Sequence, residues 1–172
     1  MILQIDDWKF DIDMERTMEH SSNEAAEHCD CAYCRNFYAT IDTCHPDLRP
    51  FLAQFGLDVE APDEMDTDVY RYDQIDYEPA YIVFGRIVQA GTSAITVGLL
   101  SILVEKPHKG SYLWDVVPKE ADCFSLRIPY FSVPWILDES IEDVVSPANE
   151  PTFLQKMWNK ILNRSPKNKT MS

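Results

Sequence analysis

The first half of the chain changes from a strand-like to a helix-like hydrophobic pattern. Apolar and polar residues alternate over residues 2–13 around two adjacent aspartates, which predicts a small β-hairpin. Apolar residues then recur at three- and four-residue spacing, which is typical of helices with one buried face. Three helices are predicted in this way, at residues 14–20, from Asp30 or Cys31 to just before Pro46, and at residues 47–56, with a further helical turn at residues 22–27.

The second half is rich in β-branched and aromatic residues, which favour strands. Four strands are predicted, at residues 80–88, 94–104, 111–117 and 123–133. Their nearly continuous apolar character indicates that both faces of the sheet are covered. Beyond Pro151, which is typical of a helix start, we expect a final helix with one apolar and one basic face.

Together these elements predict an α+β fold, with a mostly antiparallel sheet, an N-terminal helical layer and a C-terminal amphipathic helix. The chain has 172 residues, so we expect a single domain over residues 1–164 and a frayed tail over residues 165–172. The longest apolar run, residues 94–104, is too short to cross a bilayer, and the acidic N-terminus lacks the basic start of a signal peptide. Five cysteines, four of them clustered, favour a reducing cytoplasm over a disulfide-bonded secreted domain.

The net charge of −14 is unevenly distributed along the chain. Residues 1–78 carry 20 acidic and 5 basic side chains, whereas residues 151–172 carry 5 basic side chains and no acidic ones. An acidic surface repels the phosphates of nucleic acids, so direct DNA binding is not expected. The same surface attracts a basic protein partner and speeds the encounter.

Residues 58–78 are the most acidic passage, with nine carboxylates, one arginine and interleaved tyrosines. One interpretation is a solvated acidic linker. The other is a partner-binding surface, because tyrosines among carboxylates suit contact with arginine and lysine. The residues predicted for that surface are Asp63, Glu64, Asp66, Asp68, Tyr70, Tyr72, Asp73, Asp76, Tyr77 and Glu78.

The segment around residues 28–34 holds the chain's candidate metal ligands. His28, Cys29, Cys31 and Cys34 have the donor types of a zinc site at the entrance of the predicted second helix, and His20 could replace His28. Cys44 is excluded, because ten helical residues would place it roughly 15 Å from Cys34. Two alternatives stay open: Cys31 and Cys34 could be small buried hydrophobic residues, or a redox pair.

Common catalytic motifs are missing from the sequence. It contains no phosphate-binding glycine loop, no metalloprotease His-Glu-x-x-His helix and no Gly-x-Ser-x-Gly nucleophile motif. A cysteine nucleophile, Cys29 or Cys34, paired in space with a histidine is a further hypothesis.

Two short runs, Cys31-Ala-Tyr-Cys34-Arg-Asn-Phe-Tyr38 and Leu48-Arg-Pro-Phe-Leu52, resemble uncharacterised proteins encoded by gut Gram-positive bacteria and by their phages and conjugative elements. The closing run Phe153-Leu-Gln-Lys-Met-Trp158 fits the same resemblance. The resemblance implies no activity. It implies a context in which small acidic proteins that block host defence enzymes are common.

The leading hypothesis is therefore a non-enzymatic acidic binding protein, a nucleic-acid mimic that inhibits a basic, nucleic-acid-handling host defence protein. A small zinc-binding structural or interaction protein is the alternative, and a cysteine-dependent enzyme is the third hypothesis.

Overall fold

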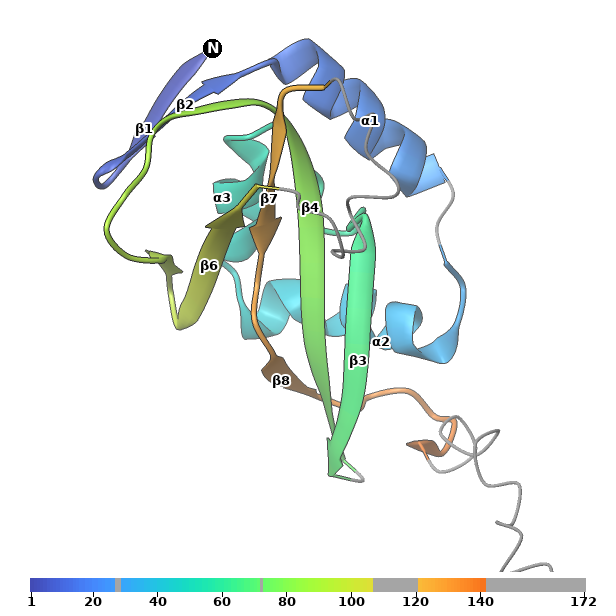
Figure 1. The fold of residues 1–172 in the computed structure, drawn as a ribbon. Coiled ribbons are helices and arrows are strands. Elements are labelled where there is room, and N and C mark those ends of the chain that lie inside the picture. Colours follow the sequence, from blue (N-terminus) through green and yellow to red (C-terminus); the bar gives the residue numbers. More distant parts are fainter. Residues whose placement is uncertain (27–28, 72, 107–120, 142–172) are drawn as a thin grey trace, which may run out of the picture. The chain divides into compact units, whose positions relative to one another are not determined.

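The computed structural model describes residues 1–26, 29–71, 73–106 and 121–141 (Figure 1). The chain divides into two compact units, Met1–Asp138 and Glu139–Ser172. The predicted strand at residues 111–117, the C-terminal helix and the frayed tail lie outside the described residues. The prediction of one domain over residues 1–164 therefore stays a prediction.

The first unit is an antiparallel sheet combined with helices, which confirms the predicted α+β class. Its three described helices are α1 (Met14–Ala26), α2 (Ala32–Cys44) and α3 (Leu48–Ala53). Its eight described strands are β1 (Ile2–Ile5), β2 (Trp8–Ile12), β3 (Glu64–Arg71), β4 (Gln74–Gln89), β5 (Ile95–Val97), β6 (Leu100–Glu105), β7 (Cys123–Arg127) and β8 (Phe131–Pro134).

The long strand β4 organises the sheet, because four other strands pair with it in antiparallel register. β3 and β2 follow one another along one edge of β4, and β8 and β7 follow one another along the other. Between β3 and β2, side chains replace the missing strand partners. The backbone N–H of Ile82 donates to Oδ2 of Asp63 (2.7 Å), and that of Phe84 donates to Oγ1 of Thr17 (3.1 Å).

The core lies between β4 and the helices α2 and α3, which are behind the sheet in Figure 1. Side chains alternate between the two faces of a strand, so the odd-numbered residues of β4 point toward the helices. Tyr77 and Tyr81 are fully buried there. The hydroxyl group of Tyr77 donates to the backbone oxygen of Tyr33 (2.7 Å), and that of Tyr81 donates to the backbone oxygen of Val59 (2.8 Å). Each side chain is therefore held by β4 at one end and by a hydrogen bond at the other.

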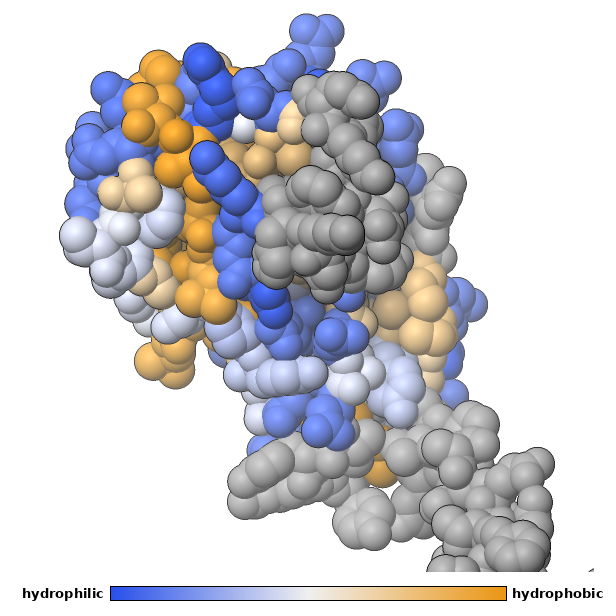
Figure 2. All heavy atoms as spheres, viewed as in Figure 1, coloured by the Kyte–Doolittle hydropathy of each residue, from blue (hydrophilic) through white to orange (hydrophobic). Residues whose placement is uncertain are grey.

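The other face of the sheet changes character along β4. Near the middle of the strand, Ala80, Ile82 and Phe84 form a buried apolar cluster, against which Ala121 and Cys123 pack. Toward the start of the strand, the same face carries carboxylates. Figure 2 shows this face: hydrophobic residues gather at the upper left, and hydrophilic residues dominate the lower half, where β3 and β8 lie.

Helix α1 is longer than predicted, because the serines expected to end it are accommodated inside it. Ser22 donates its hydroxyl hydrogen to the backbone oxygen of Met18 (2.7 Å). Ser21 is buried and accepts the backbone N–H of Asp58 (2.9 Å). Both hydroxyls are therefore satisfied without leaving the helix.

Three predictions about strands need correction. Residues 123–133 form two strands, β7 and β8, and not one. Residues 94–104 form a hairpin, β5 and β6, and not one strand, because Gly98 has a φ of +57° and starts a two-residue turn. Residues 64–71 and 74–78 form paired strands and not a solvated linker. The alternation of apolar and acidic residues in this segment has the two-residue period of a strand, and that period outweighs the high charge.

Candidate metal centre and acidic face

The three cysteines at the entrance of α2 form a cluster. Cys29 and Cys31 lie just before the helix, and Cys34 lies in its first turn. The sulfur atoms of Cys29, Cys31 and Cys34 all lie within 4.8 Å of one another. Cys29 and Cys31 are exposed and Cys34 is half-buried, so the hypothesis of a buried hydrophobic residue is wrong for Cys31.

The thiols of this cluster are not equivalent. Hydrogen bonding from the backbone and side chain of Cys31 lowers the pKa of Cys29. Burial, together with the neighbouring thiols of Cys31 and Cys29, raises the pKa of Cys34 to about 12. Cys29 is therefore the thiol that ionises more readily, and Cys34 is the one that holds its proton.

This arrangement could bind a metal ion. Two sulfur ligands at about 2.3 Å from one tetrahedral zinc ion are about 3.8 Å apart, so sulfur atoms that lie within 4.8 Å of one another need to approach by up to about 1 Å. All five cysteines are free thiols, and Cys44 lies at the far end of α2, as its spacing predicted. The predicted fourth ligand, His28, lies outside the described residues.

A pocket of about 290 Å³ opens beside the cluster. Cys29, Cys34 and Tyr38 form part of its lining. Four carboxylates line it as well, together with Ala61, Pro62 and Met65, and the described lining residues include no lysine or arginine. The carboxylates are those of Glu24, Glu60, Asp63 and Glu64. A pocket with this lining attracts cations.

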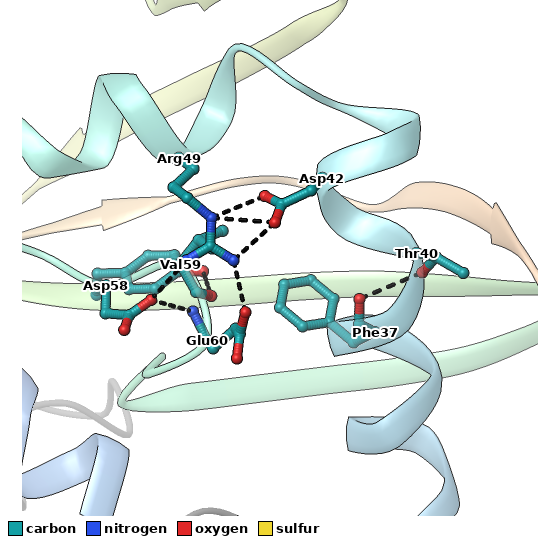
Figure 3. A network of polar contacts seen from close by, with 8 residues as sticks. Phe37, Thr40, Asp42, Arg49, Asp58, Val59 and Glu60 are labelled. Carbon is teal, nitrogen blue, oxygen red and sulfur yellow. Dashed lines mark hydrogen bonds and ion pairs between the residues drawn. The ribbon is translucent and has the colours of Figure 1, made fainter.

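Arg49 binds one residue of this lining, Glu60, within a network of ion pairs (Figure 3). Its guanidinium group bonds to Asp42 on α2 (Nη2 to Oδ2, 2.8 Å), to Asp58 (Nη1 to Oδ1, 3.2 Å) and to Glu60 (Nη2 to Oε1, 2.5 Å). The Arg49 guanidinium in turn lowers the pKa of the Asp42 carboxyl. One arginine thus joins α2, α3 and the loop that leads into β3.

The outer face of the sheet carries the second candidate site. We call the five carboxylates of Glu64, Asp66, Asp68, Asp76 and Glu78 the acidic face. Directly opposite residues of paired strands point to the same side of a sheet. Asp66 is directly opposite Glu78, and Asp68 is directly opposite Asp76. Like charges in such positions destabilise a sheet.

Among the described residues, few cations offset this repulsion. Arg127 on β7 bonds to Glu78 (3.1 Å) and to Glu105 (2.7 Å), at one end of the acidic face. At the other end, Asp76 accepts a hydrogen bond from the Ser132 hydroxyl group. Burial and the nearby Asp66 raise the pKa of Glu64.

The remaining predicted surface residues are in different environments. Tyr77 is a core residue and cannot contact a partner, because it lies on the inward side of the strand. The Asp63 side chain is only 5% exposed, because it bonds to His20 and to the backbone of Ile82. Asp73 is exposed in the turn after β3. Tyr70 lies on β3, and Tyr72 lies outside the described residues.

Sequence reasoning missed a second group of candidate metal ligands. His20, Glu24 and Asp63 offer ligand atoms that all lie within 4.8 Å of one another. The four-residue spacing of His20 and Glu24 was a visible signal. Asp63 is 43 residues from His20 along the chain, and only the packing of α1 against the start of β3 brings the two together.

The geometry does not support a cysteine–histidine pair among the described residues. The His20 ring bonds to Asp63, and the hydrogen bond raises the pKa of His20. The His45 ring packs edge-on against Phe131. None of the described helices combines the length and apolar composition that spanning a membrane requires.

Comparison with known proteins adds no family: no family model, curated protein or solved structure matches the chain.

Proposed function

We propose that the protein is a non-enzymatic binding protein whose acidic face contacts a basic protein partner. The observation that carries this proposal is the placement of like charges directly opposite one another, Asp66 against Glu78 and Asp68 against Asp76. Such pairs reduce fold stability by a few tenths of a kcal/mol to about 1 kcal/mol each. Lysines and arginines of a partner neutralise these carboxylates, so the charges that weaken the fold strengthen binding.

The chemistry of the partner follows from the shape of this face. A row of carboxylates on a strand pair presents regularly spaced negative charges, as a nucleic-acid backbone does. The partner is therefore a protein with a basic groove for nucleic acid, and inhibition of a host defence enzyme is the proposed consequence. In this proposal, the protein binds its partner in the cytoplasm.

Affinity capture with matched variants tests the proposal. The tagged protein and two double variants, Asp66→Asn with Asp68→Asn and Glu15→Gln with Glu19→Gln, are used to capture proteins from a bacterial lysate. All four residues are exposed, and each double variant loses two negative charges. We expect the wild type and the Glu15/Glu19 variant to capture basic, nucleic-acid-handling proteins, and the Asp66/Asp68 variant not to. Added DNA or raised salt should release the captured proteins. Capture that survives high salt, or that the Asp66/Asp68 variant retains, would sink the proposal.

A second candidate function has its own observation, the convergence of three sulfur atoms within 4.8 Å. In this proposal Cys29, Cys31 and Cys34 hold zinc together with a fourth ligand, and the metal fixes the entrance of α2. Metal analysis of the purified protein should find one zinc per chain, retained in Cys44→Ser and lost in Cys31→Ser. Zinc below stoichiometric amounts in the wild type would remove this candidate.

A further inference from the structure

His20, Glu24 and Asp63 meet where α1 passes the start of β3. His20 and Glu24 are one helical turn apart on α1, so their side chains project from the same face of the helix. Asp63 directly precedes β3. One ligand atom from each of the three lies within 4.8 Å of the other two, and all three residues are partly buried.

The surroundings hold two of these side chains in a defined orientation. Oδ2 of Asp63 accepts the backbone N–H of Ile82 (2.7 Å), so Oδ1 is directed to Nε2 of His20 (2.5 Å). The His20 ring packs edge-on against Phe84, with ring centroids 5.3 Å apart. Outer contacts of this kind orient the ligands in metal sites.

The separation of the donors suits a metal ion that replaces a proton. Two ligands at about 2.1 Å from an ion and at a right angle to each other are about 3.0 Å apart. Nε2 of His20 and Oδ1 of Asp63 are hydrogen-bonded at 2.5 Å, so an ion between them requires a separation about 0.5 Å larger. The His20 side chain is 26% exposed and has solvent on one side, which leaves room for this shift.

The pocket beside the thiols supplies the rest of the site. Glu24 and Asp63 line it together with Cys29 and Cys34. Its volume of about 290 Å³ has room for the water molecules that complete the coordination of a cation with three protein ligands. The neighbouring carboxylate of Glu64 adds negative potential to the same space.

We infer that His20, Glu24 and Asp63 form a second metal site, which takes a divalent cation that prefers nitrogen and oxygen ligands. One imidazole and two carboxylates suit Mn²⁺ or Fe²⁺, whereas the three thiols next to them suit zinc and softer ions. The two groups therefore differ in donor type, although members of both line one pocket. This inference does not depend on a basic partner or on zinc at the cysteines.

Titration with Mn²⁺ tests the inference, with electron paramagnetic resonance of the free ion as the readout. We expect the full-length protein to bind one Mn²⁺ per chain. The variants Glu24→Gln and His20→Gln should each weaken binding at least tenfold, since each removes one of three protein ligands. Cys29→Ser with Cys31→Ser should retain it. Glu19→Gln, which removes an exposed glutamate of the same helix, is the charge-matched control.

A thermal unfolding measurement guards against variants that fail to fold. Mn²⁺ should raise the Tm of the wild type and leave that of Glu24→Gln unchanged, because only a site in the folded state stabilises it. Absence of Mn²⁺ binding by the folded wild type overturns the inference, and so does unchanged affinity in Glu24→Gln. Loss of binding in the cysteine variant assigns the ion to the thiols, and loss in the Asp66/Asp68 variant with retention in Glu24→Gln assigns it to the acidic face. Both outcomes also overturn the inference.

Discussion

At the scale of single residues, the buried amide of Asn36 joins three segments of the fold. Asn36 is fully buried in α2. Its Nδ2 donates to the backbone oxygen of Pro134 (3.1 Å) and its Oδ1 accepts the backbone N–H of Ile136 (2.9 Å). Nδ2 also lies 3.4 Å from the hydroxyl group of Tyr77. The amide therefore fixes the chain after β8 to α2, and nothing in the sequence around Asn36 distinguishes it from a surface asparagine.

Replacing Asn36 by leucine should destabilise the protein. The substitution leaves the partners at Pro134 and Ile136 unsatisfied, which costs about 1–3 kcal/mol of unfolding free energy. Chemical denaturation measures this loss. Thr43→Ala, at an exposed position of the same helix, should change the unfolding free energy by less than about 0.5 kcal/mol. Equal stability of Asn36→Leu and Thr43→Ala would contradict the role assigned to the amide.

His45 should make the protein acid-sensitive. Its Nε2 is buried and has no hydrogen-bond partner in the part of the chain that the structure describes, and burial lowers the pKa of His45 below its ordinary value of 6.5. The unfolded chain therefore takes up a proton at a higher pH than the folded one, so stability falls as the pH drops below about 6.5. In His45→Leu this part of the pH dependence should disappear. Parallel stability profiles of the two proteins between pH 7.5 and pH 5 would refute it.

At the scale of elements, Arg49 joins α2, α3 and the loop before β3 through three carboxylates. Because its side chain is 39% exposed, solvent weakens each ion pair, and Arg49→Met should cost only about 1 kcal/mol of unfolding free energy. Arg86→Met is the control, since Asp11 is the only ion-pair partner of Arg86 among the described residues and Arg86 is 63% exposed. Its cost should be near zero, and both costs should shrink with salt. An Arg49 variant as stable as the Arg86 variant would show that the three pairs do not act together.

The sequence predicts those elements well whose pattern and end signals are local. The first hairpin, α2 and α3 have their predicted positions, and Gly56 has the left-handed φ of +82° expected after a helix. The predictions are wrong where a residue far away along the chain determines the local structure. The serines stay in α1 because Asp58 bonds to one of them, and β3 forms because β4 offers it an edge. Burial of Tyr77 follows from the side of β4 that faces the helices, and composition alone cannot show it.

The same division applies to the candidate sites. The cysteine cluster was predictable, because its members lie within six residues of one another along the chain. The acidic face was predictable as a charged segment but not as a surface, since the strand pairing decides which carboxylates lie side by side. The group of His20, Glu24 and Asp63 was not predictable, because it depends on contact between α1 and a residue 43 positions from His20.

At the scale of the whole molecule, the opposed carboxylates reduce stability, whatever they bind. Asp68→Asn removes the repulsion with Asp76 and should raise the unfolding free energy by about 0.2–1 kcal/mol at low salt, with the gain shrinking as salt screens the charges. Asp30→Asn is the matched control, because Asp30 lies 3.7 Å from Arg35 and loses an attraction instead. Asp30→Asn should bring no gain. If the acidic face opposes folding in this way, the Asp68→Asn variant is both more stable than the wild type and poorer at capturing a basic partner. Equal stability of the variant and the wild type would mean that the repulsion is already screened.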